Sequence, residues 1–119
     1  MKKLYFILLI NTVTSLILLN SCGSENSSPN PFVAKWQVTK EEGTSGNVNV
    51  GSFYDFKNDT TVTISLGLMA SDCSYRTSND TLFIHFPSNI TVVHTFKMNG
   101  DKLILNNITT DQILTLEKQ

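Results

Sequence analysis

The sequence holds few of the side chains from which catalytic and metal sites are built. Its 119 residues include only two cysteines and two histidines, and structural zinc sites draw their four ligands mainly from these residue types. There is no Gly-rich phosphate loop, no His-Glu-x-x-His pattern and no serine in a nucleophile-elbow setting. We therefore predict a protein that is not an enzyme and that carries no metal and no cofactor.

Basic residues are also scarce and scattered. Nine lysines and arginines stand against ten acidic residues, a formal net charge of −1. Removal of residues 1–21, for which the argument follows, takes Lys2 and Lys3 away and leaves seven basic residues against ten acidic ones, a net charge of −3. Nucleic-acid binding depends on clustered lysine and arginine that neutralise phosphates. The sequence therefore excludes a nucleic-acid partner.

The N-terminus has the organisation of an export signal. A short basic head, Met1-Lys2-Lys3, precedes an apolar stretch over residues 4–19 that is interrupted by four polar side chains. A permanent membrane span needs about 20 mostly apolar residues, so this stretch is too short and too polar. The pattern predicts a signal peptide over residues 1–21.

The apolar stretch ends in Leu19-Asn20-Ser21-Cys22-Gly23, which resembles the lipobox of bacterial lipoproteins. The resemblance implies that Cys22 is diacylated, becomes the mature N-terminus and anchors the protein to a membrane of the cell envelope, the outer membrane in our prediction, on its periplasmic or surface face. Several acyl chains give stable anchoring where one does not. The alternative is ordinary secretion with a cysteine at this place by chance.

Acylation of Cys22 leaves Cys73 as the only free thiol, and we expect it to be a small buried core residue. Residues 23–31 are polar and rich in Ser, Asn, Gly and Pro, with nothing to bury. Residues 22–31 are thus predicted to be the acylated cysteine and a flexible tether. The folded domain is predicted over residues 32–119.

Within this domain no window keeps the apolar spacing of three and four that helices need, whereas alternation at period two is frequent. Strands are predicted over residues 33–39, 52–57, 61–66, 72–77, 81–86, 90–97, 102–106 and 112–117. The connections 58–60, 77–80, 87–89 and 99–100 have the composition of hairpin turns. The segment 40–51 is predicted to be a long loop at a barrel mouth, with a strand around 47–50 as the alternative.

The register of these hairpins can be tested, because paired residues must face the same side. The predicted pairs are Phe56 with Val62, Tyr54 with Ile64, Tyr75 with Leu82, Cys73 with Ile84, Ile84 with Val92, Leu82 with His94, Phe96 with Leu103 and His94 with Leu105. They give one apolar face made of Tyr54, Phe56, Val62, Ile64, Leu66, Cys73, Tyr75, Leu82, Ile84, Phe86, Ile90, Val92, Phe96, Leu103 and Leu105.

Eight sequential antiparallel strands with one apolar face can close on themselves, which removes the exposed edges that promote aggregation. We therefore predict an all-β fold, an eight-stranded antiparallel up-and-down barrel. A two-sheet β-sandwich is the alternative, because the sequence does not distinguish closure from folding over.

Several local features carry a further resemblance: Trp36 in the first strand, the aromatic segment 53–56, and turns at 57–60, 79–82 and 99–103. Together they resemble the lipocalin-like domains of small lipoproteins of the Bacteroidetes, over residues 33–118. The resemblance implies that Trp36 is a structural plug at the base of the barrel. It also implies a protein that binds a small apolar ligand inside the barrel.

Four residues on the predicted inner face, Tyr54, Tyr75, His94 and Phe96, are the candidate ligand-lining residues. His85, the other histidine, is predicted to face outward as a solvated surface residue. Eight-stranded barrels are narrow and are either filled by side chains or hold one small ligand. The alternative function is therefore a non-catalytic envelope interaction or scaffold module with a filled barrel, for which the outward pair Phe83 and Val93 is a candidate patch.

Overall fold

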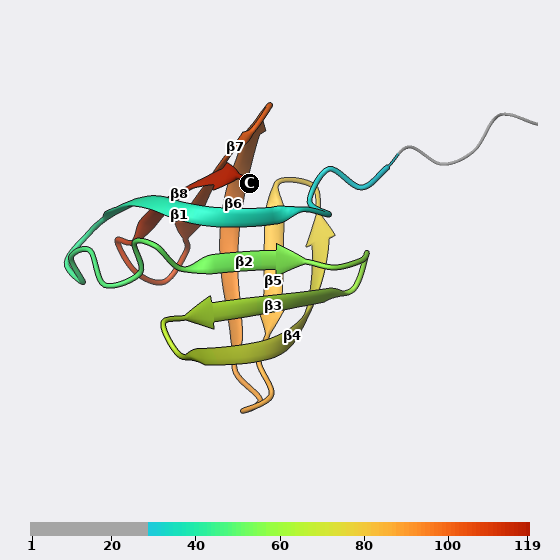
Figure 1. The fold of residues 1–119 in the computed structure, drawn as a ribbon, viewed down its shortest axis with the longest axis horizontal. Coiled ribbons are helices and arrows are strands. Elements are labelled where there is room, and N and C mark those ends of the chain that lie inside the picture. The colour runs from blue at the N-terminus through green and yellow to red at the C-terminus, as the bar shows by residue number, and fades with distance from the viewer. Residues whose placement is uncertain (1–28) are drawn as a thin grey trace, which may run out of the picture.

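The computed structural model describes residues 29–119. The predicted signal peptide and the predicted lipidation site Cys22 lie outside this range. Eight strands follow one another along the chain (Figure 1): β1 Lys35–Glu42, β2 Phe53–Phe56, β3 Thr61–Leu66, β4 Met69–Ser78, β5 Thr81–His85, β6 Thr91–Asn99, β7 Lys102–Asn107 and β8 Ile113–Lys118.

Each strand pairs antiparallel with the next one, and β8 pairs antiparallel with β1, so the sheet closes into a barrel (Figure 1). The predicted all-β, eight-stranded up-and-down barrel is thus confirmed, and the two-sheet sandwich is not formed. Closure gives every strand a neighbour on both sides and leaves no free sheet edge. The closed barrel of β1 to β8 is complete within residues 29–119.

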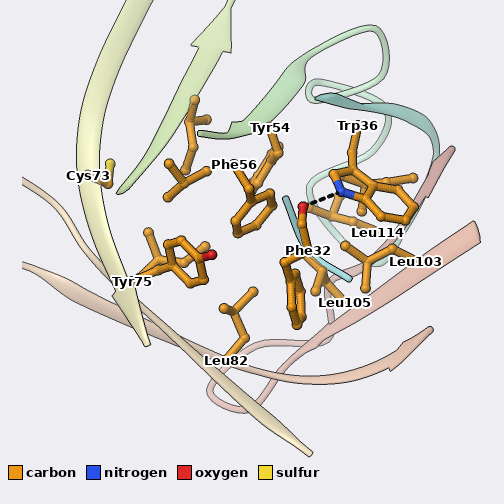
Figure 2. Packing of buried hydrophobic residues seen from close by; sticks show 14 of the residues in the cluster. Phe32, Trp36, Tyr54, Phe56, Cys73, Tyr75, Leu82, Leu103, Leu105 and Leu114 are labelled. Carbon is orange, nitrogen blue, oxygen red and sulfur yellow. Dashed lines mark hydrogen bonds between the residues drawn. The ribbon is translucent and has the colours of Figure 1, made fainter. Parts of the chain in front are cut away.

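The core follows from the period-two alternation. In β3, for example, Val62 and Ile64 are buried, whereas Thr61, Thr63 and Ser65, which alternate with them, are half-buried. Inward side chains of seven strands and Phe32 form one buried cluster (Figure 2): Phe32, Trp36, Val38, Tyr54, Phe56, Val62, Ile64, Cys73, Tyr75, Leu82, Ile84, Leu103, Leu105, Leu114 and Leu116. Phe96 and Met98 of β6 are partly buried and pack against it. Cys73 is a buried thiol in this cluster, as predicted.

The predicted register is confirmed in β2–β3, where Tyr54 pairs with Ile64, and in β5–β6, where Leu82 pairs with His94. It is wrong by two residues in β4–β5 and β6–β7, where Tyr75 pairs with Ile84 and Phe96 with Leu105. The corresponding predicted pairs, including Cys73 with Ile84 and His94 with Leu105, are not formed.

Turn geometry explains both errors. The turns are the two-residue types 79–80 and 100–101, in which Asn79 and Gly100 have φ values of 57° and 60°. Asn and Gly tolerate this left-handed conformation, which tight hairpins require. A slip by two residues moves the partners along the strand but keeps each side chain on its face, so the inward face was predicted correctly.

The first strand is longer than predicted and contains an irregularity. It extends to Glu42, and the alternative strand around residues 47–50 is not formed. The pairing of β1 with β8 shifts between Val38 and Lys40, which is the signature of a β-bulge. Because the bulge inserts one residue, Glu41 and not Lys40 follows Val38 on the buried side.

The alternating strand directions give the barrel two different ends. We call one end the closed end; it carries residues 29–34 and the turns 57–60, 79–80 and 100–101. We call the other end the mouth; it carries the loops 43–52, 67–68, 86–90 and 108–112.

An aromatic side chain ahead of the first strand fills the closed end. Phe32 is 3% exposed, and its ring centroid lies 5.2 Å from that of Phe56 and 4.8 Å from that of Phe96. The indole Nε1 of Trp36 donates a hydrogen bond of 2.9 Å to the carbonyl of Phe32 (Figure 2). Trp36 is fully buried here, at the position that the resemblance assigns to a plug.

Candidate functional site

A cavity of about 230 Å³ opens at the mouth of the barrel. Its walls come from inward positions near the mouth ends of β2, β3, β5 and β6, and include Tyr54, Ile64, Ile84, Phe86, Val92 and His94. Three of these residues are aliphatic and two are aromatic rings. Polar side chains line the cavity as well: Tyr54 and His94, and the amides of Asn49, Asn107 and Gln112.

The structure separates the four candidate ligand-lining residues into two pairs. Tyr54 and His94 line the cavity. Tyr75 and Phe96 lie at the closed end, where the Tyr75 hydroxyl donates to the Asn58 carbonyl at 2.5 Å and the Phe96 ring packs edge-on against Phe32. Alternation identifies the face of a strand on which a residue lies, but not its height along the barrel axis.

His94 is the one buried side chain within residues 29–119 that leaves a polar atom without a partner. The residue is 3% exposed, and its Nδ1 has no hydrogen bond. Burial lowers the pKa of His94 from 6.5 to about 4, because a charged imidazole loses its hydration inside the barrel. The ring is therefore neutral at pH 7. A buried polar atom without a hydrogen-bond partner lowers the stability of the fold, and native structures contain few such atoms.

Tyr54 stands in the same wall of the cavity as a neutral phenol. Burial raises its pKa to about 12, and the negative charges that Cys73 and Glu41 can carry add to the effect. Its hydroxyl thus keeps its proton throughout the physiological range.

Glu41 is a buried carboxylate that joins two loops of the mouth. It is 5% exposed and accepts hydrogen bonds from the backbone N–H and the side-chain amide of Asn49, from Gln112 and from Ser45, the first three at 2.7–2.8 Å. Burial raises the pKa of Glu41, but these hydrogen bonds lower it by more, so its pKa lies below the ordinary 4.5. The carboxylate therefore fixes the loops 43–52 and 108–112 beside the cavity.

Sequence reasoning did not identify Glu41. Strict alternation along the first strand places Lys40 on the inward side after Trp36 and Val38, and only the bulge reverses this parity. No pattern in the local sequence predicts the bulge.

Two residues predicted to be on the inner face lie instead at the edge of the mouth. Leu66 is 46% exposed and Ile90 is 57% exposed. Leu66 is the last residue of β3 and Ile90 directly precedes β6. Neither belongs to the buried core, although Leu66 still lines the mouth cavity.

On the outer wall, Phe83 and Val93 pair as neighbours on β5 and β6, as predicted. Both are half-buried, and the guanidinium carbon of Arg76 lies 3.7 Å from the centre of the Phe83 ring. The candidate patch is thus covered by a cation–π contact. His85, predicted to be outward, is exposed on this wall and hydrogen-bonds to Thr91 at 2.9 Å.

The chain is thus, by its fold, a small closed β-barrel with one filled end and one open mouth. No protein-family model, no curated protein and no solved structure matches it. Among residues 29–119 no three His, Cys, Asp or Glu side chains are grouped so that they could hold a metal ion. The same part of the chain contains no helix long and apolar enough to cross a membrane.

Proposed function

We propose that this protein is a lipid-anchored lipoprotein of the bacterial cell envelope, with a lipocalin-like domain that holds a small apolar ligand carrying one polar group. The mouth cavity supports the proposal, because ligand sites combine aliphatic and aromatic walls with a few convergent polar groups, and here His94 and the amides of Asn49, Asn107 and Gln112 stand beside such walls. The unpartnered Nδ1 of His94 would gain a hydrogen bond from such a ligand.

The volume of the cavity limits the size of the ligand. A volume of about 230 Å³ lies between that of an engineered cavity that takes benzene, about 150 Å³, and that of ordinary drug-sized sites, about 300 Å³ or more. A substituted aromatic ring or a short acyl segment matches this volume.

The electrostatics of the cavity limit the polar group. No lysine or arginine lines it, and the Glu41 carboxylate lies nearby with its oxygens already hydrogen-bonded. An anionic group would enter without a cation to pair with, which is unfavourable in a partly buried site. The proposed ligand therefore carries a neutral hydroxyl, carbonyl or amide group that reaches His94 or Tyr54.

The ligand proposal predicts that Val92→Phe weakens binding of the neutral fluorescent probe N-phenyl-1-naphthylamine at least tenfold, because the larger side chain fills the cavity. Val93→Phe is the matched control, since the neighbouring residue of the same strand faces outward. Probe titration with both variants and the unaltered protein measures the effect. Equal affinity of all three proteins would show that the probe does not bind in the mouth cavity.

The alternative function, an interaction or scaffold module with a filled barrel, is favoured by one observation. The closed half of the interior is filled by Phe32, Phe56, Tyr75 and their neighbours. The same titration decides between the two functions, together with a comparison of native and denaturing mass spectra. A protein that takes up no probe and carries no co-purifying molecule would have the alternative function.

The anchor is the second part of the proposal, and it is supported by the Leu19-to-Gly23 pattern. We expect the full chain, produced in a bacterium that matures lipoproteins, to sediment with membranes and to carry acyl mass on Cys22. Cys22→Ser removes the acylated atom and is expected to abolish both the acyl mass and processing before residue 22. Unchanged processing and membrane recovery of this variant would contradict lipidation.

A further inference from the structure

Exposed apolar side chains gather at one end of the barrel. Seven of the eight large hydrophobic residues that are exposed within residues 29–119 lie in or next to the mouth loops, and we call them the apolar rim: Val48, Val50, Leu66, Leu68, Met69, Ile90 and Ile108. The eighth, Val33, lies at the closed end. Single exposed apolar residues are common, but a group collected at one end of a domain marks an interaction site.

The parts of the rim are close to one another and project from the barrel. Val48, Val50 and Leu66 line one groove between the loop 43–52 and the turn 67–68. In that turn Gly67 has a φ of 62°, a left-handed conformation that glycine adopts without cost. The turn presents Leu68 fully to the solvent, with Met69 beside it at 77% exposure.

The mouth loops are almost free of charge. The segments 43–52, 67–68, 86–90 and 108–112 contain no lysine or arginine. Their one charged residue is Asp111, whose carboxylate accepts hydrogen bonds from the backbone N–H and the hydroxyl of Thr44. The closed end, in contrast, carries Lys57, Asp59, Asp80 and Asp101 in its turns.

We infer that the apolar rim inserts into the surface of a lipid bilayer, at the boundary between headgroups and acyl chains. The rim consists of Val, Leu, Ile and Met alone, whereas the centres of protein–protein interfaces are enriched in Trp, Tyr and Arg. Leu, Ile and Val enter a bilayer favourably, and charged side chains are the costly ones there. An aliphatic rim on loops that carry no basic residue and a single carboxylate, Asp111, matches the lipid phase better than it matches another protein.

The composition of the rim also indicates whether electrostatic attraction or burial of apolar area would bind it to a membrane. Basic residues near a membrane bind anionic lipids and make the binding sensitive to salt. Because the mouth loops have none, docking depends on burial of apolar area and not on the charge of the lipid headgroups.

The rim gives the mouth cavity a lipid-facing entrance, since Leu66 lines both the groove of the rim and the cavity. Docking therefore extends the proposed function, because an apolar ligand would enter the cavity from the lipid bilayer. The docking itself does not require that the cavity holds a ligand.

The test uses residues 29–119, which lack Cys22 and contain the complete barrel, with vesicles of pure phosphatidylcholine in a flotation assay. We expect the barrel to float with the vesicles, and the double variant Leu68→Ser/Met69→Ser to partition at least tenfold more weakly. Val33→Ser is the matched control, because it removes the one exposed large apolar side chain at the other end, and we expect no change. Raising the salt concentration or adding anionic lipid is expected to leave binding the same.

Three results would overturn the inference. The first is no flotation of the unaltered barrel, and the second is flotation that requires anionic lipid. The third is a rim-dependent dimer, detected by light scattering without vesicles, which would assign the rim to a second copy of the chain. Probe binding by the double variant and vesicle binding by Val92→Phe distinguish failure of docking from failure of the ligand proposal.

Discussion

Trp36→Ala is expected to lower the free energy of unfolding by about 4 kcal/mol, because truncation of a buried aromatic side chain costs about 3–5 kcal/mol. Trp36 is fully buried at the start of β1, and the Lys118 ammonium lies 5.3 Å from its ring centre. Equilibrium unfolding in urea measures the loss. It is a large part of the total, since small domains have only about 5–15 kcal/mol of stability.

The cost has two sources at the closed end. Loss of the ring opens a cavity among close-packed side chains. Loss of Nε1 leaves the Phe32 carbonyl without its hydrogen bond, which is one of several that join residues 30–34 to the barrel. Phe32 itself is part of the aromatic cluster with Phe56, Tyr75 and Phe96.

Trp36→Phe separates these two sources, because phenylalanine retains an apolar ring but has no N–H. We expect this variant to lose about 1–2 kcal/mol, a typical value for one hydrogen bond with a buried acceptor and some lost packing. A stability of Trp36→Ala within about 1 kcal/mol of the unaltered protein, against the usual range for aromatic truncation, would mean that the indole does not plug the barrel.

The sequence was sufficient to predict eight antiparallel strands and their inward faces, because these features are local, but it did not distinguish closure into a barrel from a two-sheet sandwich. Alternation along each strand determines which side chains face the core, and this parity survives a slip by two residues. The length and position of a turn are harder to predict from sequence. The turn predicted at 77–80 was too long and the two-residue turn predicted at 99–100 was one residue too early, whereas the hairpins turn at 79–80 and 100–101 with left-handed φ values at Asn79 and Gly100.

The candidate site was predicted only in part, because its position depends on the whole barrel. Tyr54 and Tyr75 share the inner face, but only Tyr54 borders the mouth cavity, whereas Tyr75 packs against Phe32 at the closed end. Glu41 reaches the interior through a bulge. Phe32 precedes the first strand, so its burial follows from packing of the N-terminal segment and not from a period-two pattern.

His94 is expected to make the barrel sensitive to acid. Its pKa is lowered from 6.5 to about 4 in the folded protein. Below pH 6.5 the unfolded chain therefore binds a proton at His94 that the folded chain does not bind until the pH approaches 4. Wherever the unfolded state binds more protons than the folded state, the free energy of unfolding decreases as the pH is lowered. The stability that neutral His94 contributes is therefore fully present above pH 6.5 and is lost as the pH falls from 6.5 to 4.

The loss is measurable with urea unfolding at several pH values. A pKa displaced by one pH unit corresponds to about 1.4 kcal/mol, so the whole window is expected to cost about 3 kcal/mol, of which about 2 kcal/mol appears by pH 5. Glu41 acts at lower pH, because its lowered pKa means that its stabilisation is lost only as the pH falls through that pKa. The interval from pH 6.5 to 5 therefore reports mainly on His94.

His94→Gln has no proton to bind and is expected to flatten the stability profile between pH 6.5 and 5, whatever its stability at pH 7. His85→Gln is the matched control, because it removes a histidine that is exposed on the outer wall, and we expect it to keep the profile of the unaltered protein. A ligand that accepts or donates a hydrogen bond at Nδ1 would stabilise the neutral barrel most at pH 7. If the profile of His94→Gln keeps its slope in this interval, His94 is not the buried neutral group that faces the cavity.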